Sequence, residues 1–149
     1  TLMGGDPEKD IAAQAHYVGH LNALKPSLTV EENLQFWARY FGGGAVASST
    51  IDHALEAFAL TALAGIPAGY LSAGQKRRAC LARLRVTPRP LWLLDEPTVS
   101  LDTASVALLA RQIDAHAAGG GLVVAATHIP LGLAQQQRVD LGTIRETAA

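Results

Sequence analysis

Two adjacent carboxylates, Asp95 and Glu96, directly follow the apolar run at residues 91–94. Neighbouring side chains on a strand point to opposite sides, so the two carboxylates can perform different tasks. Hydrolysis of a nucleoside triphosphate needs an oxygen ligand for Mg²⁺ and a base that orients the attacking water. We expect Asp95 to hold Mg²⁺ and Glu96 to polarise the water. Asp-Glu-Pro is also ordinary turn chemistry, but an apolar strand running into two carboxylates favours a catalytic site.

The segment 71–75, Leu-Ser-Ala-Gly-Gln, is a second candidate site. Ser72 and Gln75 have the spacing of a helix capping box, in which each side chain satisfies a backbone N–H group. A helix N-terminus with free N–H groups also binds anions, and Gly74 lets a phosphate approach closely. Alone, the segment indicates a helix cap. Together with the carboxylates it favours a phosphate site formed by Ser72, Ala73, Gly74 and Gln75.

His128 follows another apolar run, residues 122–126. In parallel sheets, ligands bind at the carboxyl ends of the strands, where the carboxylates are also expected. We therefore expect His128 to contact the γ-phosphate, although a histidine at a strand end can also be a satisfied core residue. Ser100 and Asp102 come shortly after the carboxylates, and Asp102 is equally well placed to be the N-cap of the next helix.

The sequence contains no Gly-x-x-x-x-Gly-Lys-Ser/Thr phosphate loop. Residues 4–9 include glycine and lysine, but Glu8 stands where the second glycine is needed. No lysine follows the glycines at 42–44, so neither segment can cradle phosphates as the full loop does. The first residue is Thr1 rather than an initiator methionine. We expect the sequence to be the later part of an ATPase domain that lacks the phosphate-loop strand.

Caps and hydrophobic periodicity predict the elements that position these residues. We expect strands ending at residue 18 and covering 91–94 and 122–126, and helices over about 29–42, 50–65, 73–86 and 103–117. A strand, a helix and a second strand in this order form a right-handed unit with parallel strands. The predicted fold class is therefore α/β, with a parallel sheet and a small helical insert over about residues 27–70.

The composition indicates one globular domain: 149 residues, 49% hydrophobic and 17% charged, with a net charge of -1. This neutral balance argues against nucleic acid as a partner. No apolar run approaches the roughly 18 residues of a membrane span, so membrane association is expected only through a partner. Cys80 is the lone cysteine, which fits a reducing compartment.

Several other charged or titratable side chains are expected to be exposed. The basic cluster at residues 76–78 has the composition of a solvated helix face. Three histidines lack any catalytic setting and are expected at the surface: His16, His53 and His116.

Taken together, these residues resemble the ATP-binding subunit of ABC transporters, as one incomplete nucleotide-binding domain over residues 1–149. The segment 71–75 is similar to the family signature, with Ala73 in place of the commoner glycine. Residues 91–96 resemble the Walker B strand with its catalytic glutamate, residues 100–102 the D-loop, and His128 the switch histidine. When the chain is aligned with the family on Pro26, His20 occupies the position where the family's Q-loop usually has a glutamine.

A narrower resemblance is to the haem-exporter ATPases of cytochrome c maturation, carried by residues 17–34, 71–75, 89–97 and 126–128. In this branch both Ala73 and His20 are expected features. The resemblance implies a subunit that binds ATP and Mg²⁺ and hydrolyses ATP to drive haem export or handling for c-type cytochromes.

The resemblance also implies two partners. One is a membrane-spanning transporter subunit, which places this chain at the cytoplasmic face of the bacterial inner membrane. The other is a second ATP-binding subunit in a head-to-tail dimer. Ser72 and Gly74 would then act on ATP held by the other subunit, while Asp95, Glu96 and His128 act within their own. Without a phosphate loop, this chain alone is expected to be inactive, and the strand at 122–126 is expected to be an exposed edge.

Two alternatives stay open. The chain could be the ATPase subunit of another ABC exporter, which a membrane partner with a different substrate would indicate. It could instead be a truncated, non-catalytic module that pairs with a complete subunit, which a natural start codon near Thr1 would indicate.

Overall fold

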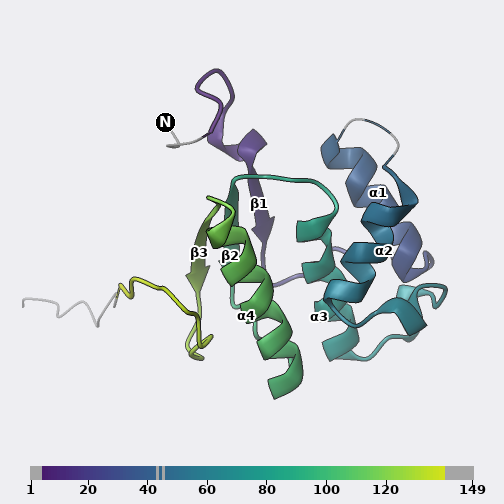
Figure 1. Ribbon diagram of the computed structural model, residues 1–149. Coiled ribbons are helices and arrows are strands. Elements are labelled where there is room, and N and C mark those ends of the chain that lie inside the picture. Colours follow the sequence, from purple (N-terminus) through teal and green to yellow (C-terminus); the bar gives the residue numbers. More distant parts are fainter. Residues whose placement is uncertain (1–4, 43, 45, 140–149) are drawn as a thin grey trace, which may run out of the picture.

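The computed structural model describes residues 5–42, 44 and 46–139. In this part of the chain, three parallel strands form one sheet in the order β1-β2-β3 (Figure 1). Their bounds are Ala15–Val18 for β1, Leu91–Asp95 for β2 and Leu122–Ala126 for β3. The parallel register sets Asp95 opposite Ala126, so the carboxyl ends of the strands meet at one edge. The predicted α/β class with a parallel sheet is confirmed.

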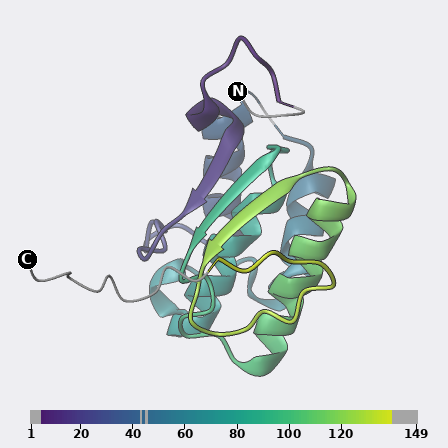
Figure 2. The same ribbon diagram turned by 90° about the vertical axis from the view of Figure 1, so that its left-hand side faces the viewer.

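The central strand is β2, as its continuous apolar run predicted, because both of its neighbours pair with it. Helix α4, Thr103–Ala118, returns the chain from β2 to β3. Figure 2 shows the helices behind the sheet, with the face toward the viewer not covered by a helix in the described part of the chain. Within that part β3 pairs on one side only, and Leu122 and Val124 are 51% and 55% exposed. The prediction of an exposed edge strand is therefore confirmed.

The helical insert contains α1, Val30–Gly42, and α2, Ser48–Ala57. The predicted capping box begins α1: the Thr29 N–H donates to Glu32 Oε2 at 2.8 Å, and the Glu32 N–H donates to Thr29 Oγ1 at 3.1 Å. Helix α1 ends at Gly42, the first of the glycines that were expected to stop it. Gly4 and Gly43, which belong to the two segments rejected above as phosphate loops, lie outside the described residues.

The prediction of a helix up to about residue 65 is wrong, because α2 ends at Ala57. Phe58 and Leu60 are both fully buried, and a regular helix cannot turn both side chains into the same core. The chain instead reverses at Ala59, whose φ of 51° lies in the left-handed region. Two short 3₁₀ turns, Thr61–Leu63 and Ala68–Tyr70, complete the insert.

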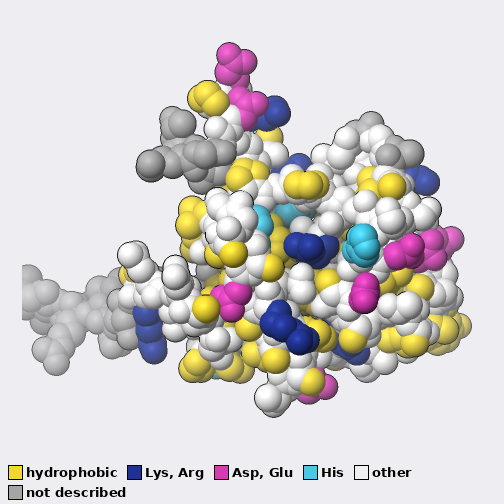
Figure 3. Space-filling view, in the orientation of Figure 1, with side chains coloured by type: hydrophobic (Ala, Val, Ile, Leu, Met, Phe, Trp, Pro, Cys, Tyr) yellow, Lys and Arg dark blue, Asp and Glu magenta, His cyan; other side chains and the backbone are white. Residues whose placement is uncertain are grey.

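Helix α3, Ala73–Ala82, is shorter than the predicted helix, because its last turn tightens into a 3₁₀ helix at Arg83–Arg85. One hydrophobic core joins the insert, α3, α4 and the sheet. Its members with the largest side chains include Leu34, Phe58, Leu60, Leu81, Leu84, Trp92 and Leu109. On the face shown in Figure 3, acidic and basic side chains are interspersed among hydrophobic ones. Among the described residues, no helix combines the length and the apolar character needed to cross a membrane.

The expectation that three histidines are exposed holds only for His53. His16 has no exposed surface, because its ring packs edge-on against Phe41 and its Nε2 donates to the carbonyl of Thr87 at 2.8 Å. His116 is half-buried, with its ring stacked on Trp92 at 3.9 Å between centroids. Both rings cover apolar core surface, a role that the sequence pattern does not signal.

Candidate functional site

The predicted carboxylates and histidine meet at the carboxyl edge of the sheet. Asp95 is the last residue of β2, and Glu96 extends the ladder by donating its N–H to the carbonyl of Ala126 at 2.8 Å. His128 follows β3, and its Nδ1 lies 3.0 Å from Glu96 Oε2. The side chains of His128 and Glu96 are 71% and 36% exposed, respectively. An exposed ion pair is weak, so Glu96 and His128 are within reach of a ligand that competes for either group.

Glu96 has an unusual backbone conformation. Its φ is 44°, in the left-handed region where a non-glycine residue costs of the order of 1–3 kcal/mol. Hydrogen bonds on both sides of Glu96 hold this backbone conformation: the Glu96 N–H donates to the carbonyl of Ala126, and the Glu96 carbonyl accepts from Arg77 Nη2 at 2.8 Å. Such outliers persist where the surrounding structure fixes them, and they concentrate at functional sites.

Asp95 presents a half-exposed carboxylate beside Glu96. The hydroxyl of Tyr17, on the neighbouring strand β1, donates to Asp95 Oδ2 at 3.4 Å, which is a long hydrogen bond. The described residues contain no group of three or more His, Cys, Asp or Glu side chains that could hold a metal ion by themselves. A single accessible carboxylate fits Mg²⁺, which commonly takes one or two protein carboxylates and fills its other positions with water and phosphate oxygens.

Ser72 and Gln75 form the predicted capping box at the start of α3. The Ser72 N–H donates to Gln75 Oε1 at 2.8 Å, and the Gln75 N–H donates to Ser72 Oγ at 3.2 Å. Ser72 and Ala73 are exposed, so this helix N-terminus faces solvent. The helix-cap interpretation is thus confirmed, and the proposed phosphate site on the same residues stays a prediction.

Gly74 has a structural reason to be glycine that sequence reasoning did not find. A Cβ at this position would lie 2.7 Å from the backbone oxygen of Ser100. The loop after β2 therefore packs directly on the start of α3, bringing the 71–75 and 100–102 segments together. Ser100 itself has a φ of 65°. Asp102 caps α4 by accepting from the Ser105 N–H at 2.8 Å, and hydrogen bonds from Ser105 lower the pKa of this carboxyl.

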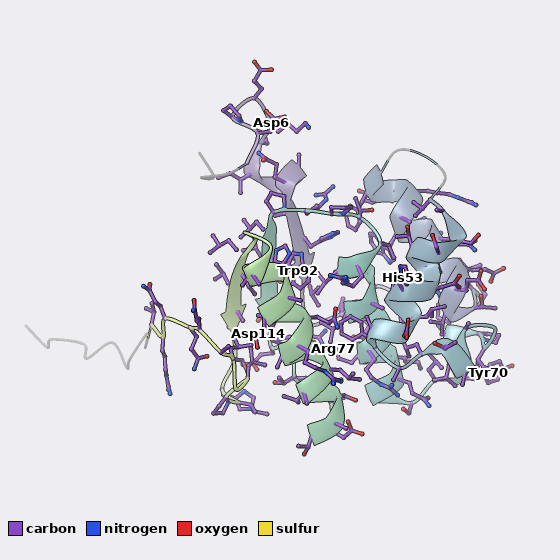
Figure 4. All side chains as sticks on the ribbon, viewed as in Figure 1. Asp6, His53, Tyr70, Arg77, Trp92 and Asp114 are labelled. Carbon is purple, nitrogen blue, oxygen red and sulfur yellow. The ribbon has the colours of Figure 1, made fainter. Side chains whose placement is uncertain are left out.

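His20 lies in the exposed segment between β1 and α1. The structure connects this segment to the carboxylate turn through Arg77, which donates from Nη1 to the carbonyl of Gly19 at 2.8 Å. The expectation that residues 76–78 form a solvated helix face is wrong for Arg77, which is 3% exposed. Its burial is possible because its guanidinium donates to backbone carbonyls on two other segments. In Figure 4 Arg77 lies within the fold, whereas Asp6 and Tyr70 lie at its periphery.

Comparison with known proteins gives consistent matches. The family model described as "ABC transporter" matches residues 3–99. The "Cytochrome c biogenesis ATP-binding export protein CcmA" of Nitrobacter winogradskyi is 53% identical over 92% of this chain and 67% of its own length. The protein of the same name from Rhodopseudomonas palustris is 51% identical over 92% of this chain and 67% of its own length. The one from Paracoccus denitrificans is 59% identical over 87% of this chain and 59% of its own length. This chain thus spans roughly two thirds of these relatives.

Solved structures that share the fold include the following two. One is a dimeric ATP-binding cassette in a post-hydrolysis state with ADP and phosphate, 26% identical, with a TM-score of 0.67 over 78% of this chain and 53% of that one. The other is an ATP-binding subunit of an ABC transporter, 24% identical, with a TM-score of 0.69 over 78% of this chain and 49% of that one. This chain spans about half of each.

Proposed function

The chain belongs to the ABC transporter family, and from this premise we propose that it acts in an ATP-hydrolysing subunit that energises haem export or handling during c-type cytochrome biogenesis. The names of the relatives that are 51–59% identical support the choice of pathway. The observation that carries the catalytic part is the Glu96–His128 pair, 3.0 Å apart at the ends of two adjacent parallel strands.

In this proposal each side chain at the carboxyl edge has a separate task. Glu96 accepts a hydrogen bond from the attacking water and orients it toward the γ-phosphate. His128, which pairs with Glu96 through Nδ1, contacts the phosphate oxygens through Nε2. Asp95 holds Mg²⁺, which, when bound, neutralises charge on the phosphates. The strained backbone at Glu96 keeps its carboxylate in place before substrate arrives.

The second site, at the start of α3, is proposed to act on a different ATP molecule. Ser72, Ala73, Gly74 and Gln75 form an exposed helix N-terminus, which suits the negative charge of a triphosphate. In a head-to-tail dimer this surface covers ATP held by the other subunit, with Ser100, Asp102 and His20 near the same nucleotide-binding interface. The solved dimeric cassette with ADP and phosphate is consistent with this arrangement.

We place this subunit at the cytoplasmic face of the inner membrane, attached through a membrane-spanning partner. ATP binding also requires a phosphate loop, and the 149 residues contain no such motif. Residues 1–149 are therefore proposed to be inactive by themselves, and ATP turnover is to be measured on the native gene product in its membrane complex.

The test is ATP turnover by the purified complex with Glu96→Gln. The amide keeps the size of the side chain but cannot act as the base, so turnover should fall by roughly 10²- to 10⁴-fold while ATP still binds. Glu56→Gln, an exposed glutamate on α2, is the matched control and should leave turnover unchanged. Wild-type turnover in the Glu96 variant would contradict the assignment of the base.

A further inference from the structure

Arg77 is the side chain that joins the start of α3 to both other segments of the site. It lies in the second turn of α3 and is 3% exposed. Its Nε donates to the carbonyl of Pro97 at 3.1 Å, and its Nη2 donates to the carbonyls of Asp95 and Glu96 at 3.1 and 2.8 Å. One guanidinium therefore binds three consecutive carbonyls of the carboxylate turn.

The remaining nitrogen of the same guanidinium faces the segment after β1. Nη1 donates to the carbonyl of Gly19 at 2.8 Å and to Asn22 Oδ1 at 3.4 Å. These two residues flank His20, the residue proposed at the Q-loop position. The planar fork of arginine spans both segments at once, whereas the single ammonium of lysine cannot reach the same set of acceptors.

The charge of Arg77 is compensated in an unusual way. All five acceptors are backbone carbonyls or an amide oxygen, and none is a carboxylate. Burial lowers the pKa of Arg77 from its usual value, so holding this cation inside the fold has a cost. The hydrogen bonds that offset this cost connect α3 to two separate segments of the candidate site. What the guanidinium fixes most directly is the left-handed backbone of Glu96, whose carbonyl it binds.

We propose that Arg77 is a positioning residue for ATP hydrolysis, which sets the carboxylate turn at 95–97 relative to the segment 19–22. This inference rests on the proposed function. Arg77 touches no reacting atom in this scheme: it acts through the backbone that aims Glu96. Because Arg77 also belongs to α3, the helix that Ser72 caps, a shift of α3 when the partner subunit closes would be transmitted to the turn that carries the base.

The test compares Arg77→Lys with Arg78→Lys in the native complex. Arg78 is the matched control, because it lies on the same helix and also donates to two carbonyls, those of Phe58 and Ala59, but not to the carboxylate turn. Misplacing a catalytic group by about 1 Å can cost about 100-fold, so Arg77→Lys should lower kcat by roughly 10- to 100-fold with the KM for ATP nearly unchanged. Arg78→Lys should leave both constants close to wild type.

If the Arg77→Lys complex does not assemble, Arg77→Gln replaces it, because glutamine buries no charge. Arg77→Gln should show the same loss of kcat at unchanged KM. Wild-type kcat in a folded Arg77 variant, or an equal loss in Arg78→Lys, would overturn the inference. The wild-type complex separates this outcome from failure of the proposed function. Turnover that Glu96→Gln abolishes but Arg77→Lys spares refutes only the role of Arg77, whereas a wild-type complex without turnover refutes the function itself.

Discussion

The two ends of the three-stranded sheet hold their polar groups in opposite ways. At the amino end, His16 is fully buried and bonded to the carbonyl of Thr87, and Arg89 donates to the carbonyl of Ala15 at 2.8 Å while lying over the ring of Phe41. At the carboxyl end, the Glu96–His128 pair is exposed and the backbone of Glu96 is strained.

This contrast separates stability from chemistry. At the amino end His16 is shielded from water, and both His16 and Arg89 are bonded to backbone carbonyls, so changing them should alter the free energy of unfolding. The side chains of Glu96 and His128 at the carboxyl end are accessible and weakly paired, so changing them should alter ATP turnover with little effect on stability. If the division holds, substitution should change the free energy of unfolding more at His16 than at His128.

The largest effect on stability is expected at His16. Burial lowers its pKa from 6.5 to about 4, because desolvation disfavours the charged ring. The folded protein therefore prefers neutral His16, so its contribution to stability is complete above the unfolded pKa of 6.5 and is lost as the pH falls toward 4. From about pH 7 to about pH 4, this one group should lower the free energy of unfolding by about 3 kcal/mol.

Urea unfolding of wild type and His16→Gln across this pH range measures that contribution as a difference between the two curves. His53→Gln, which removes an exposed histidine from α2, is the matched control variant. Parallel curves for wild type and His16→Gln would show that His16 does not titrate differently in the folded and unfolded states.

Gly74→Ala is the expected exception to the division, because this carboxyl-end residue is tightly packed. The added Cβ would lie 2.7 Å from the backbone oxygen of Ser100, so the two segments must separate. We expect a loss of about 1–3 kcal/mol in the free energy of unfolding, together with reduced ATP turnover. At Gly65 a Cβ meets nothing within 4 Å, so Gly65→Ala is the matched control. Equal stability of the two variants would show that the close approach to Ser100 is not a constraint.

The smallest effect on stability is expected for His128→Ala. Its ion pair with Glu96 is exposed, so removing it should change the free energy of unfolding by about 0–1 kcal/mol. Turnover should nevertheless fall by roughly 10²-fold or more, since the proposed phosphate contact and the orientation of Glu96 are both lost. A large loss of stability with turnover preserved would reverse the division between the two ends of the sheet.

Local patterns predicted the parts of the fold and site that depend on neighbouring residues. The capping boxes at Thr29 and Ser72 follow from side chains three residues apart, and the N-cap at Asp102 follows from a carboxylate directly before a helical segment. The continuous apolar runs predicted β2 and β3, and parallel pairing then brought Glu96 and His128 together.

Features that depend on distant partners were missed. Arg77 and His16 are buried because carbonyls far away in the sequence accept their hydrogen bonds, and no local pattern reports such partners. Helix α2 ends early because both Phe58 and Leu60 enter the core, so tertiary packing overrides helix propensity. The roles of Ser72 and His20 toward nucleotide stay predictions, because they concern a ligand and a second subunit.

The central claim is that the carboxyl end of the sheet hydrolyses ATP with Glu96 as the base. It is tested most directly by identifying the nucleotide that stays bound to the purified Glu96→Gln complex after incubation with Mg²⁺ and ATP and removal of free nucleotide. Chromatography of the released nucleotide should show ATP for Glu96→Gln and ADP for wild type and Glu56→Gln. ADP on the Glu96→Gln complex would show that hydrolysis proceeds without this carboxylate and would contradict the account.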